Sequence, residues 1–208
     1  MRPSDVLIIG RRLRIPTRSG GAGGSGLAAG GKGGGHSATT AAVATRAGSA
    51  TAASDFCETF TPTAGPRRVL PAALAANPGR LALRPLFVRW SEQYGVPAAL
   101  TEAIAWQESG WQVGAVSSAQ AVGVGQLLPT TADFVSHQLI GTNLDITTAN
   151  DNIRMSARYL AYLQSEEGSI CRTVAAYYEG SANMARFGVF PETEPYVASV
   201  EALVPRFD

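Results

Sequence analysis

The chain has 208 residues, two histidines, two cysteines and a net charge of +1. This length suits one domain of ordinary size with appended segments, and the small net charge does not indicate a nucleic-acid-binding protein. The longest apolar runs fall far short of the roughly 20 residues that cross a bilayer, so the sequence predicts no membrane span.

The first 55 residues differ in composition from the rest. They contain no Phe, Trp or Tyr, and residues 19–55 consist almost wholly of Gly, Ala, Ser and Thr. Such a segment cannot bury enough apolar area to offset its lost conformational entropy, so we predict a disordered linker at residues 17–55. Residues 1–55 carry seven Arg or Lys and two Asp, against ten and fourteen in the remainder. This basic excess would suit an anionic surface, and it would equally suit a purely solubilising role.

Residues 56–79 are predicted to form an extension before the folded domain, and this extension contains Cys57. The second cysteine, Cys171, lies far along the chain. An even number of cysteines permits a disulfide in an exported protein, whereas the alternative is two small buried thiols. Nothing in the sequence fixes their separation, so both alternatives stay open here.

From about residue 80 the apolar residues recur at helical spacing. One helix is predicted over residues 84–94 and closed by Gly95, and a second begins at Pro97 and ends at Ser109-Gly110. Glu108 therefore lies in a last helical turn, where the helix dipole disfavours a carboxylate by roughly 0.3–1 kcal/mol. With Trp106 and Trp111 beside it in sequence, Glu108 is a candidate catalytic acid; the alternative is a surface glutamate that ends a helix.

A further helix is predicted at Pro129–Leu139, with Thr130 or Thr131 near its N-cap and Asp133 facing solvent. Residues 153–163 are also strongly periodic. No β-rich segment competes with these helices, so the predicted fold class is all-α with short connections.

The strongest motif runs from Glu108 to Ala132 and reads ESGWQVGAVSSAQAVGVGQLLPTTA. It aligns without a gap to the pattern E-S-x-F-x-P-x-A-x-S-x-x-G-A-x-G-L-M-Q-L-M-P-x-T-A. It thus resembles the signature of the soluble lytic transglycosylase family, which implies a goose-lysozyme-like fold and peptidoglycan cleavage. Gly125 stands where the family has a Met that lines the sugar cleft, which implies extra room at this point.

Three later blocks resemble the same family in the same order. Residues 144–153 resemble its LfDPxxNI connection, Ala175–Gly180 resembles A-A-Y-N-A-G, and residues 191–197 resemble P-x-E-T-x-x-Y-V. The Tyr178 and Glu179 departures in the second block resemble the Gram-positive, LysM-bearing branch. The resemblance covers about residues 80–208, and it implies a catalytic domain there that acts as a monomer.

Residues 1–16, MRPSDVLIIGRRLRIP, resemble the C-terminal half of a LysM repeat, D-x-I-x-x-G-x-x-L-x-I-P. The alternative is a chance apolar strand with basic flanks. A complete LysM repeat is a βααβ unit that binds N-acetylglucosamine chains, so the resemblance implies that the chain begins inside a domain. The apolar stretch Val6–Gly10 is too short for a signal-peptide core of about 7–15 residues. We therefore expect a secreted or cell-wall protein whose export signal lies upstream.

The chemistry that the resemblance implies needs a single carboxyl group. Most glycosidases use two, about 5 or about 6.5–9.5 Å apart, and the motif around Glu108 supplies no second one. In the family one Glu protonates the leaving oxygen and then deprotonates the C6 hydroxyl of N-acetylmuramic acid, which closes a 1,6-anhydro ring. The resemblance assigns this role to Glu108. The reaction requires no cofactor, and His36 and His137 do not suggest a metal site.

The resemblance also implies roles in substrate binding. Ser117 and Gln126 would bond the sugar or its acetamido group, or they would cap backbone groups instead. Tyr177 and Tyr178 would orient the acid or the substrate, or they would be core-edge aromatics. Glu192 would lie near the peptide stem of the substrate, or it is an ordinary surface glutamate.

Two alternatives to a lytic transglycosylase stay open. One is a non-catalytic wall-binding protein that keeps the fold, although such a module has no need for an acid at a helix C-terminus. The other is a hydrolytic muramidase on the same fold, which would need a positioned water.

Overall fold

The computed structural model describes residues 55–63 and 65–208. The predicted LysM-like segment at 1–16 and nearly all of the predicted linker at 17–55 lie outside the described residues, so both stay predictions. Within the described part no helix has both the length and the apolar character needed to span a membrane.

The described residues fold almost entirely into helices, which confirms the predicted all-α fold class. Two isolated β-bridges occur in this part of the chain, and no longer strand does. In chain order the helices are α1 (Asp55–Thr59), α2 (Ala72–Ala75), α3 (Pro78–Leu81), α4 (Arg84–Tyr94), α5 (Ala98–Ser109), α6 (Pro129–Asp133), the π-helix η2 (Phe134–Ile140), α7 (Ala149–Glu167), α8 (Ile170–Glu179), α9 (Ser181–Phe187) and α10 (Glu194–Phe207).

Helices α4 and α5 have the bounds that the sequence predicts, apart from one residue at the start of α5. Gly95 and Gly110 end them in the left-handed conformation, with φ of 72° and 61°, which glycine adopts without steric cost. Pro97 is the N-cap of α5 and not its first helical residue. Both boundaries place Glu108 in the last turn of α5, as predicted.

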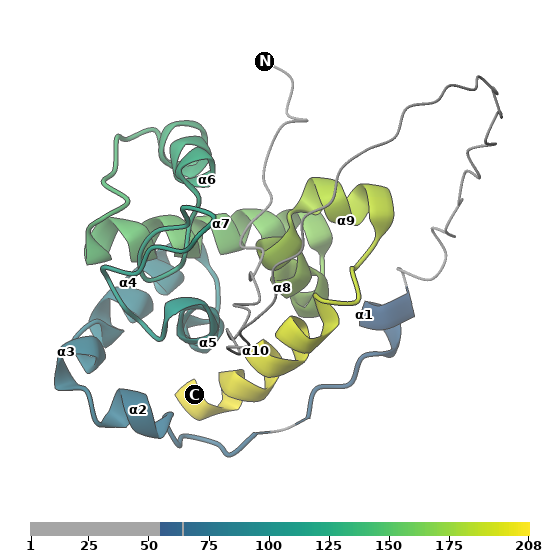
Figure 1. Cartoon of the computed structure of the whole chain (residues 1–208), viewed down its shortest axis with the longest axis horizontal. Coiled ribbons are helices and arrows are strands. Elements are labelled where there is room, and N and C mark those ends of the chain that lie inside the picture. Colours follow the sequence, from purple (N-terminus) through teal and green to yellow (C-terminus); the bar gives the residue numbers. More distant parts are fainter. Residues whose placement is uncertain (1–54, 64) are drawn as a thin grey trace, which may run out of the picture. The chain divides into compact units, whose positions relative to one another are not determined.

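Helix α5 is the central helix of the core. Because its side chains are buried on nearly all sides, it shows little amphipathic pattern of its own. It packs against α4 and α10, while α7 packs against α4, α8 and η2. Figure 1 shows α7 extending across the view, with α5 and α10 on one side of it and α6 on the other. The buried residues of α5 are Ala99, Leu100, Thr101, Glu102, Ala103, Ile104, Ala105 and Ser109.

The helix predicted at Pro129–Leu139 changes its winding after one turn. The α-helical part α6 ends at Asp133, and the chain continues as the π-helix η2 to Ile140. Thr130 and Thr131 lie near the N-cap, as predicted, but Leu128 holds the N-cap position and no side chain caps the helix. The hydroxyl of Thr131 is instead buried without a hydrogen-bond partner among the described residues. Asp133 faces solvent as predicted, with its side chain 75% exposed.

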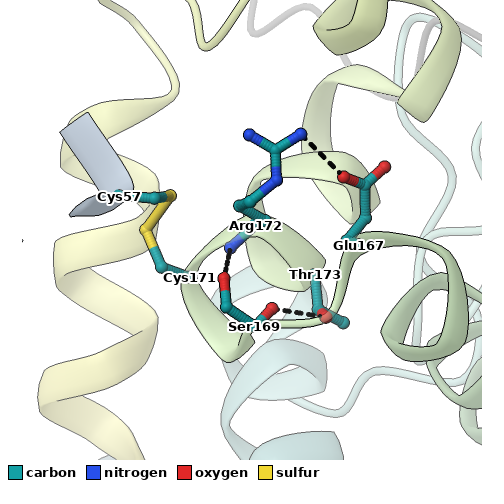
Figure 2. Close-up of polar contacts among 6 residues, drawn as sticks. All are labelled: Cys57, Glu167, Ser169, Cys171, Arg172 and Thr173. Atoms are coloured by element: carbon teal, nitrogen blue, oxygen red, sulfur yellow. Dashed lines mark hydrogen bonds and ion pairs between the residues drawn. A yellow bond between two sulfur atoms is a disulfide. The ribbon is translucent and has the colours of Figure 1, made fainter. Parts of the chain in front are cut away.

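A disulfide between Cys57 and Cys171 joins α1 to the first turn of α8 (Figure 2). The sequence leaves open whether the two cysteines form a disulfide or stay as buried thiols, and the structure shows the disulfide. Next to it, the hydroxyl of Ser169 caps α8 by accepting a hydrogen bond from the Arg172 backbone N–H at 3.3 Å. The predicted extension at 56–79 is thus covalently tied to the helix that begins at Ile170.

Candidate active site

Glu108 is half-buried at the end of α5 and contacts the start of α10. Its Oε1 accepts a hydrogen bond from the hydroxyl of Tyr196 at 2.6 Å. Tyr196 is buried in the first turn of α10. The packing of α10 against α5 therefore brings a tyrosine hydroxyl to the carboxyl that the sequence motif singles out.

Tyr196 acts as a hydrogen-bond donor to this carboxyl at neutral pH. Burial raises the pKa of Tyr196 well above its usual value, and the negative charge of Glu108 raises it further. The hydroxyl therefore keeps its proton. The ring of Tyr178, from α8, stacks on the ring of Tyr196 with 4.4 Å between their centroids. These contacts bring together three residues from three helices: Glu108, Tyr178 and Tyr196.

The hydroxyl of Ser109 joins the loop after α5 to the end of that helix through two hydrogen bonds. The Ser109 hydroxyl donates to the carbonyl of Val124 at 2.7 Å and accepts from the backbone N–H of Gln112 at 3.1 Å. Within the loop, Val122 forms antiparallel bridges with both Val116 and Leu127. The small-residue motif therefore folds back on itself directly beside the turn that carries Glu108.

The side chain of Asn152, in α7, also makes hydrogen bonds to the backbone of this loop. Its Nδ2 donates to the carbonyls of Val122 at 3.0 Å and Ile146 at 2.8 Å, and its Oδ1 accepts from the N–H of Gly125 at 2.8 Å. A Cβ at Gly123 would lie 2.4 Å from Asn152 Nδ2. Only glycine at position 123 permits this close approach.

Gly125 does not leave the extra room in a sugar cleft that the sequence implies. A Cβ at this position would lie 2.0 Å from Ser156 Oγ and 3.0 Å from the Tyr177 hydroxyl. The direction of a side chain at residue 125 is therefore filled by α7 and α8, and the expectation of open space is wrong. The absence of a side chain lets the loop backbone pack directly against these two helices.

Three of the predicted substrate-binding residues make contacts within this framework. Tyr177 is fully buried, and its hydroxyl donates to the carbonyl of Gly125 at 2.8 Å. The amide nitrogen of the buried Gln126 donates to the carbonyls of Ala115 and Gly123 at 3.3 and 3.0 Å. The half-buried Ser117 accepts from the N–H of Ala121 at 3.0 Å. For Ser117 and Gln126 these contacts match the alternative of backbone capping.

The other predicted residues and Trp111 lie in different surroundings. Tyr178 is half-buried, and Glu192 is exposed just before α10. The ring of Trp111 packs between Phe87 and Phe207, with centroid distances of 4.6 and 5.6 Å. Its Nε1 donates to the carbonyl of Glu102 at 2.9 Å. Trp111 therefore belongs to the core, and the aromatic hydrogen-bonded to Glu108 is Tyr196, which the sequence indicated only as part of the P-x-E-T-x-x-Y-V block.

Two other carboxyl groups are buried in the described part of the chain, and each has partners away from Glu108. Glu102 accepts a hydrogen bond from the Nε of Arg84 at 2.9 Å. Burial raises the pKa of Glu102 to about 7, and the neighbouring arginine opposes this rise. Glu179 accepts from the Phe190 N–H and from the Thr193 hydroxyl. Among residues 55–63 and 65–208 no group of three His, Cys, Asp or Glu side chains is placed to hold a metal ion.

Comparison with solved structures identifies similar folds. A lytic transglycosylase Slt from Pseudomonas aeruginosa, solved as an inactive glutamate-to-glutamine mutant, is 26% identical with a TM-score of 0.54 over 58% of this chain and 23% of that one. The 70 kDa soluble lytic transglycosylase of Escherichia coli is 25% identical with a TM-score of 0.53, over 59% of this chain and 23% of that one. A 70-kDa soluble lytic transglycosylase in complex with bulgecin A gives 25% identity and a TM-score of 0.53, over 56% and 22%.

The match therefore covers less than a quarter of the length of these solved proteins. Residues 85–188, half of the chain, match the family model of the transglycosylase SLT domain. This region includes α5, the loop after it, and α7 and α8. The chain belongs to the transglycosylase SLT domain family.

Proposed function

We propose that this chain is a peptidoglycan lytic transglycosylase. It cleaves the β-1,4 bond between N-acetylmuramic acid and N-acetylglucosamine, and Glu108 serves first as general acid and then as general base. The observation that carries the proposal is the carboxyl of Glu108 at the end of α5, held by the Tyr196 hydroxyl at 2.6 Å. Membership of the SLT family and the gapless motif that begins at Glu108 support it.

In the first step Glu108 gives its proton to the glycosidic oxygen, and the bond between that oxygen and C1 of N-acetylmuramic acid breaks. N-acetylglucosamine then leaves with a free hydroxyl. In the second step the Glu108 carboxylate removes the proton from the C6 hydroxyl, whose oxygen bonds to C1. The product is a 1,6-anhydro ring, and Glu108 regains its proton. These steps consume no water and require no metal or cofactor.

Tyr196 supports both steps by fixing the carboxyl. A donor to Oε1 sets the orientation of the carboxyl group relative to the reacting oxygens in both steps. The stacked ring of Tyr178 holds Tyr196 from the side. Because both tyrosines come from other helices, the acid is held by the tertiary structure and not by α5 alone.

The other predicted site residues form two groups: those that bond the backbone of the loop and those that retain exposed surface. Ser117, Gln126 and Tyr177 shape the loop beside Glu108 through bonds to its backbone. Tyr178 and Glu192 retain exposed surface, and they contact the glycan or its peptide stem in our proposal. The disulfide supports an extracytoplasmic location, where peptidoglycan lies and disulfides persist.

Product analysis on purified peptidoglycan tests the proposal. Mass spectrometry of the released fragments should show 1,6-anhydro ends. Reducing ends instead would indicate the hydrolytic muramidase. Binding to peptidoglycan with no fragments released would indicate the non-catalytic wall-binding protein.

A further inference from the structure

The mechanism above makes no use of Glu179, which is buried at the last position of α8. Its Oε2 accepts two hydrogen bonds, from the backbone N–H of Phe190 at 3.0 Å and from the hydroxyl of Thr193. Its Oε1 is buried with no partner among the described residues. A carboxyl group in this setting pays a desolvation cost that two hydrogen bonds offset only in part. A contribution to the stability of the fold therefore does not by itself explain why a glutamate occupies this position.

The two donors to Glu179 belong to the segment that leads into α10. Thr193 is the residue immediately before α10, and its side chain makes no cap to that helix. Its backbone N–H donates to the carbonyl of Phe190 at 2.8 Å, and its own carbonyl accepts from Val197 at 3.0 Å. Glu179 therefore bonds both ends of the turn at residues 190–193, and this turn is continuous with the first turn of α10.

Tyr196 lies in that first turn, three residues after Thr193. The position of the turn at 190–193 thus sets where the Tyr196 hydroxyl points. Glu179 directly follows Tyr178, whose ring stacks on Tyr196. The end of α8 consequently holds Tyr196 in two ways, through a ring contact and through the start of the helix that carries it.

We propose that Glu179 is a positioning residue: its hydrogen bonds to Phe190 and Thr193 place the start of α10 so that Tyr196 reaches Glu108. The catalytic part of this proposal rests on the proposed transglycosylase function. A carboxyl oxygen is a suitable acceptor here, because its two lone pairs can accept from the Phe190 N–H and the Thr193 hydroxyl at the same time.

Two substitutions of similar size separate the effect of the hydrogen bonds from that of burial. In Glu179→Gln the amide oxygen can take the place of Oε2 and keep both bonds. In Glu179→Leu both donors lose their acceptor while the apolar contacts stay. We expect Glu179→Gln to keep kcat within about threefold of the unaltered protein. We expect Glu179→Leu to lower kcat by up to about 10²-fold with a smaller change in KM, the loss that a small misplacement of a catalytic group can cause. Release of anhydro ends from a soluble glycan is the measured rate.

A double-mutant comparison tests whether Glu179 acts through Tyr196. In a Tyr196→Phe background the hydroxyl is already absent, so Glu179→Leu should add little to the loss. If the two losses multiply in full, or if Glu179→Leu keeps normal kcat, the proposal is wrong. Thr193→Val removes one donor and leaves the Phe190 bond, so it should lower kcat in the same direction even if Glu179→Leu fails to fold. Glu166→Gln, at an exposed position of α7, is the matched control and should leave the rate unchanged.

Amide hydrogen exchange gives a readout that does not depend on activity. The N–H of Phe190 should exchange faster in Glu179→Leu than in the unaltered protein, and nearly as slowly in Glu179→Gln. If the unaltered protein releases no fragments, the proposed function fails while this exchange difference still tests the positioning. If the unaltered protein is active and Phe190 exchanges equally in all three proteins, only the positioning role fails.

Discussion

The hydroxyl of Tyr196 lies 2.6 Å from Oε1 of Glu108, although 88 residues separate them in the chain. The packing of α10 on α5 produces this pair, by bringing the first turn of one helix to the last turn of the other. Tyr196 lies beyond residue 188, where the match to the family model ends. The helix after the matched region therefore completes the surroundings of Glu108.

Glu108→Gln should abolish cleavage and keep the fold. The amide can still accept the hydrogen bond from Tyr196, but it can neither donate nor take up the proton, so both steps fail. The loss should be at least the ~10²–10⁴-fold typical of one acid–base group. Release of anhydro ends measures the rate, and circular dichroism checks the fold. Near-normal turnover by a folded variant would remove Glu108 from its proposed role.

Tyr196→Phe should lower kcat by about 10- to 100-fold, because hydrogen bonds to charged groups contribute about 1.5–3 kcal/mol. The ring and its stacking on Tyr178 are retained, so the variant should keep the fold, which circular dichroism checks. Tyr162→Phe in α7 is the matched control. Equal rates for Tyr196→Phe and this control would show that the hydroxyl has no part in the reaction.

The free energy of unfolding should carry a contribution from Glu102 that decreases as the pH rises from about 5 to 8. Burial raises the pKa of Glu102 from 4.5 to about 7, so the folded protein holds the proton more tightly than the unfolded chain does. This contribution is full below pH 4.5 and is lost as the pH rises through about 7. It amounts to about 3 kcal/mol at most, at ~1.4 kcal/mol for each pKa unit.

Denaturant unfolding of the unaltered protein and of Glu102→Gln at both ends of this pH range measures the effect. The amide can still accept from Arg84 but does not titrate, so the variant should gain stability relative to the unaltered protein as the pH rises. A difference between the two proteins that is independent of pH would contradict the expectation.

Reduction of the disulfide should lower the free energy of unfolding by about 2–4 kcal/mol, the usual range for a natural cross-link. The bond closes a loop between residues 114 positions apart, so its loss enlarges the freedom of the unfolded chain. Denaturant unfolding with and without a reducing agent measures the effect. The double variant Cys57→Ser, Cys171→Ser should match the reduced protein and should not respond to the reducing agent.

Gly125→Ala should destabilise the fold by about 1–3 kcal/mol, the typical cost of overpacking a well-packed site. The added Cβ would lie 2.0 Å from Ser156 Oγ, so the loop or α7 must shift. Adding Ser156→Gly should recover part of the loss, which thermal unfolding of the two variants would show. Gly114→Ala is the control, since a Cβ there would meet nothing within 4 Å.

The helix ends near Glu108 could be predicted from the sequence because their causes are local. Gly95 and Gly110 adopt a backbone conformation that few other residues tolerate, and Pro97 marks the start of a helix wherever it is packed. The π-helical winding of η2 could not be predicted, because over so few residues the apolar spacing does not separate it from an α-helix.

The parts of the site that depend on distant segments were predicted poorly. The sequence indicates open space at Gly125 because α7 and α8, which fill that space, are absent from the local motif. Tyr196 was recognised within a block but not as the partner of Glu108, because pairing across 88 residues follows from helix packing. The burial of Tyr177 likewise follows from the position of α8 in the core, which its sequence neighbours do not reveal.

The bond between Cys57 and Cys171 also determines how the fold carries mechanical load. Tension applied to the chain ahead of Cys57 passes through the sulfur atoms into the first turn of α8. The stretch from residue 58 to residue 170, which contains Glu108 and Asn152, lies within the closed covalent ring and is spared that tension. A pull on the segment that precedes the domain therefore acts on the helix that carries Tyr177 and Glu179, and does not strip α2, α3 and α4 away from α5 one after another.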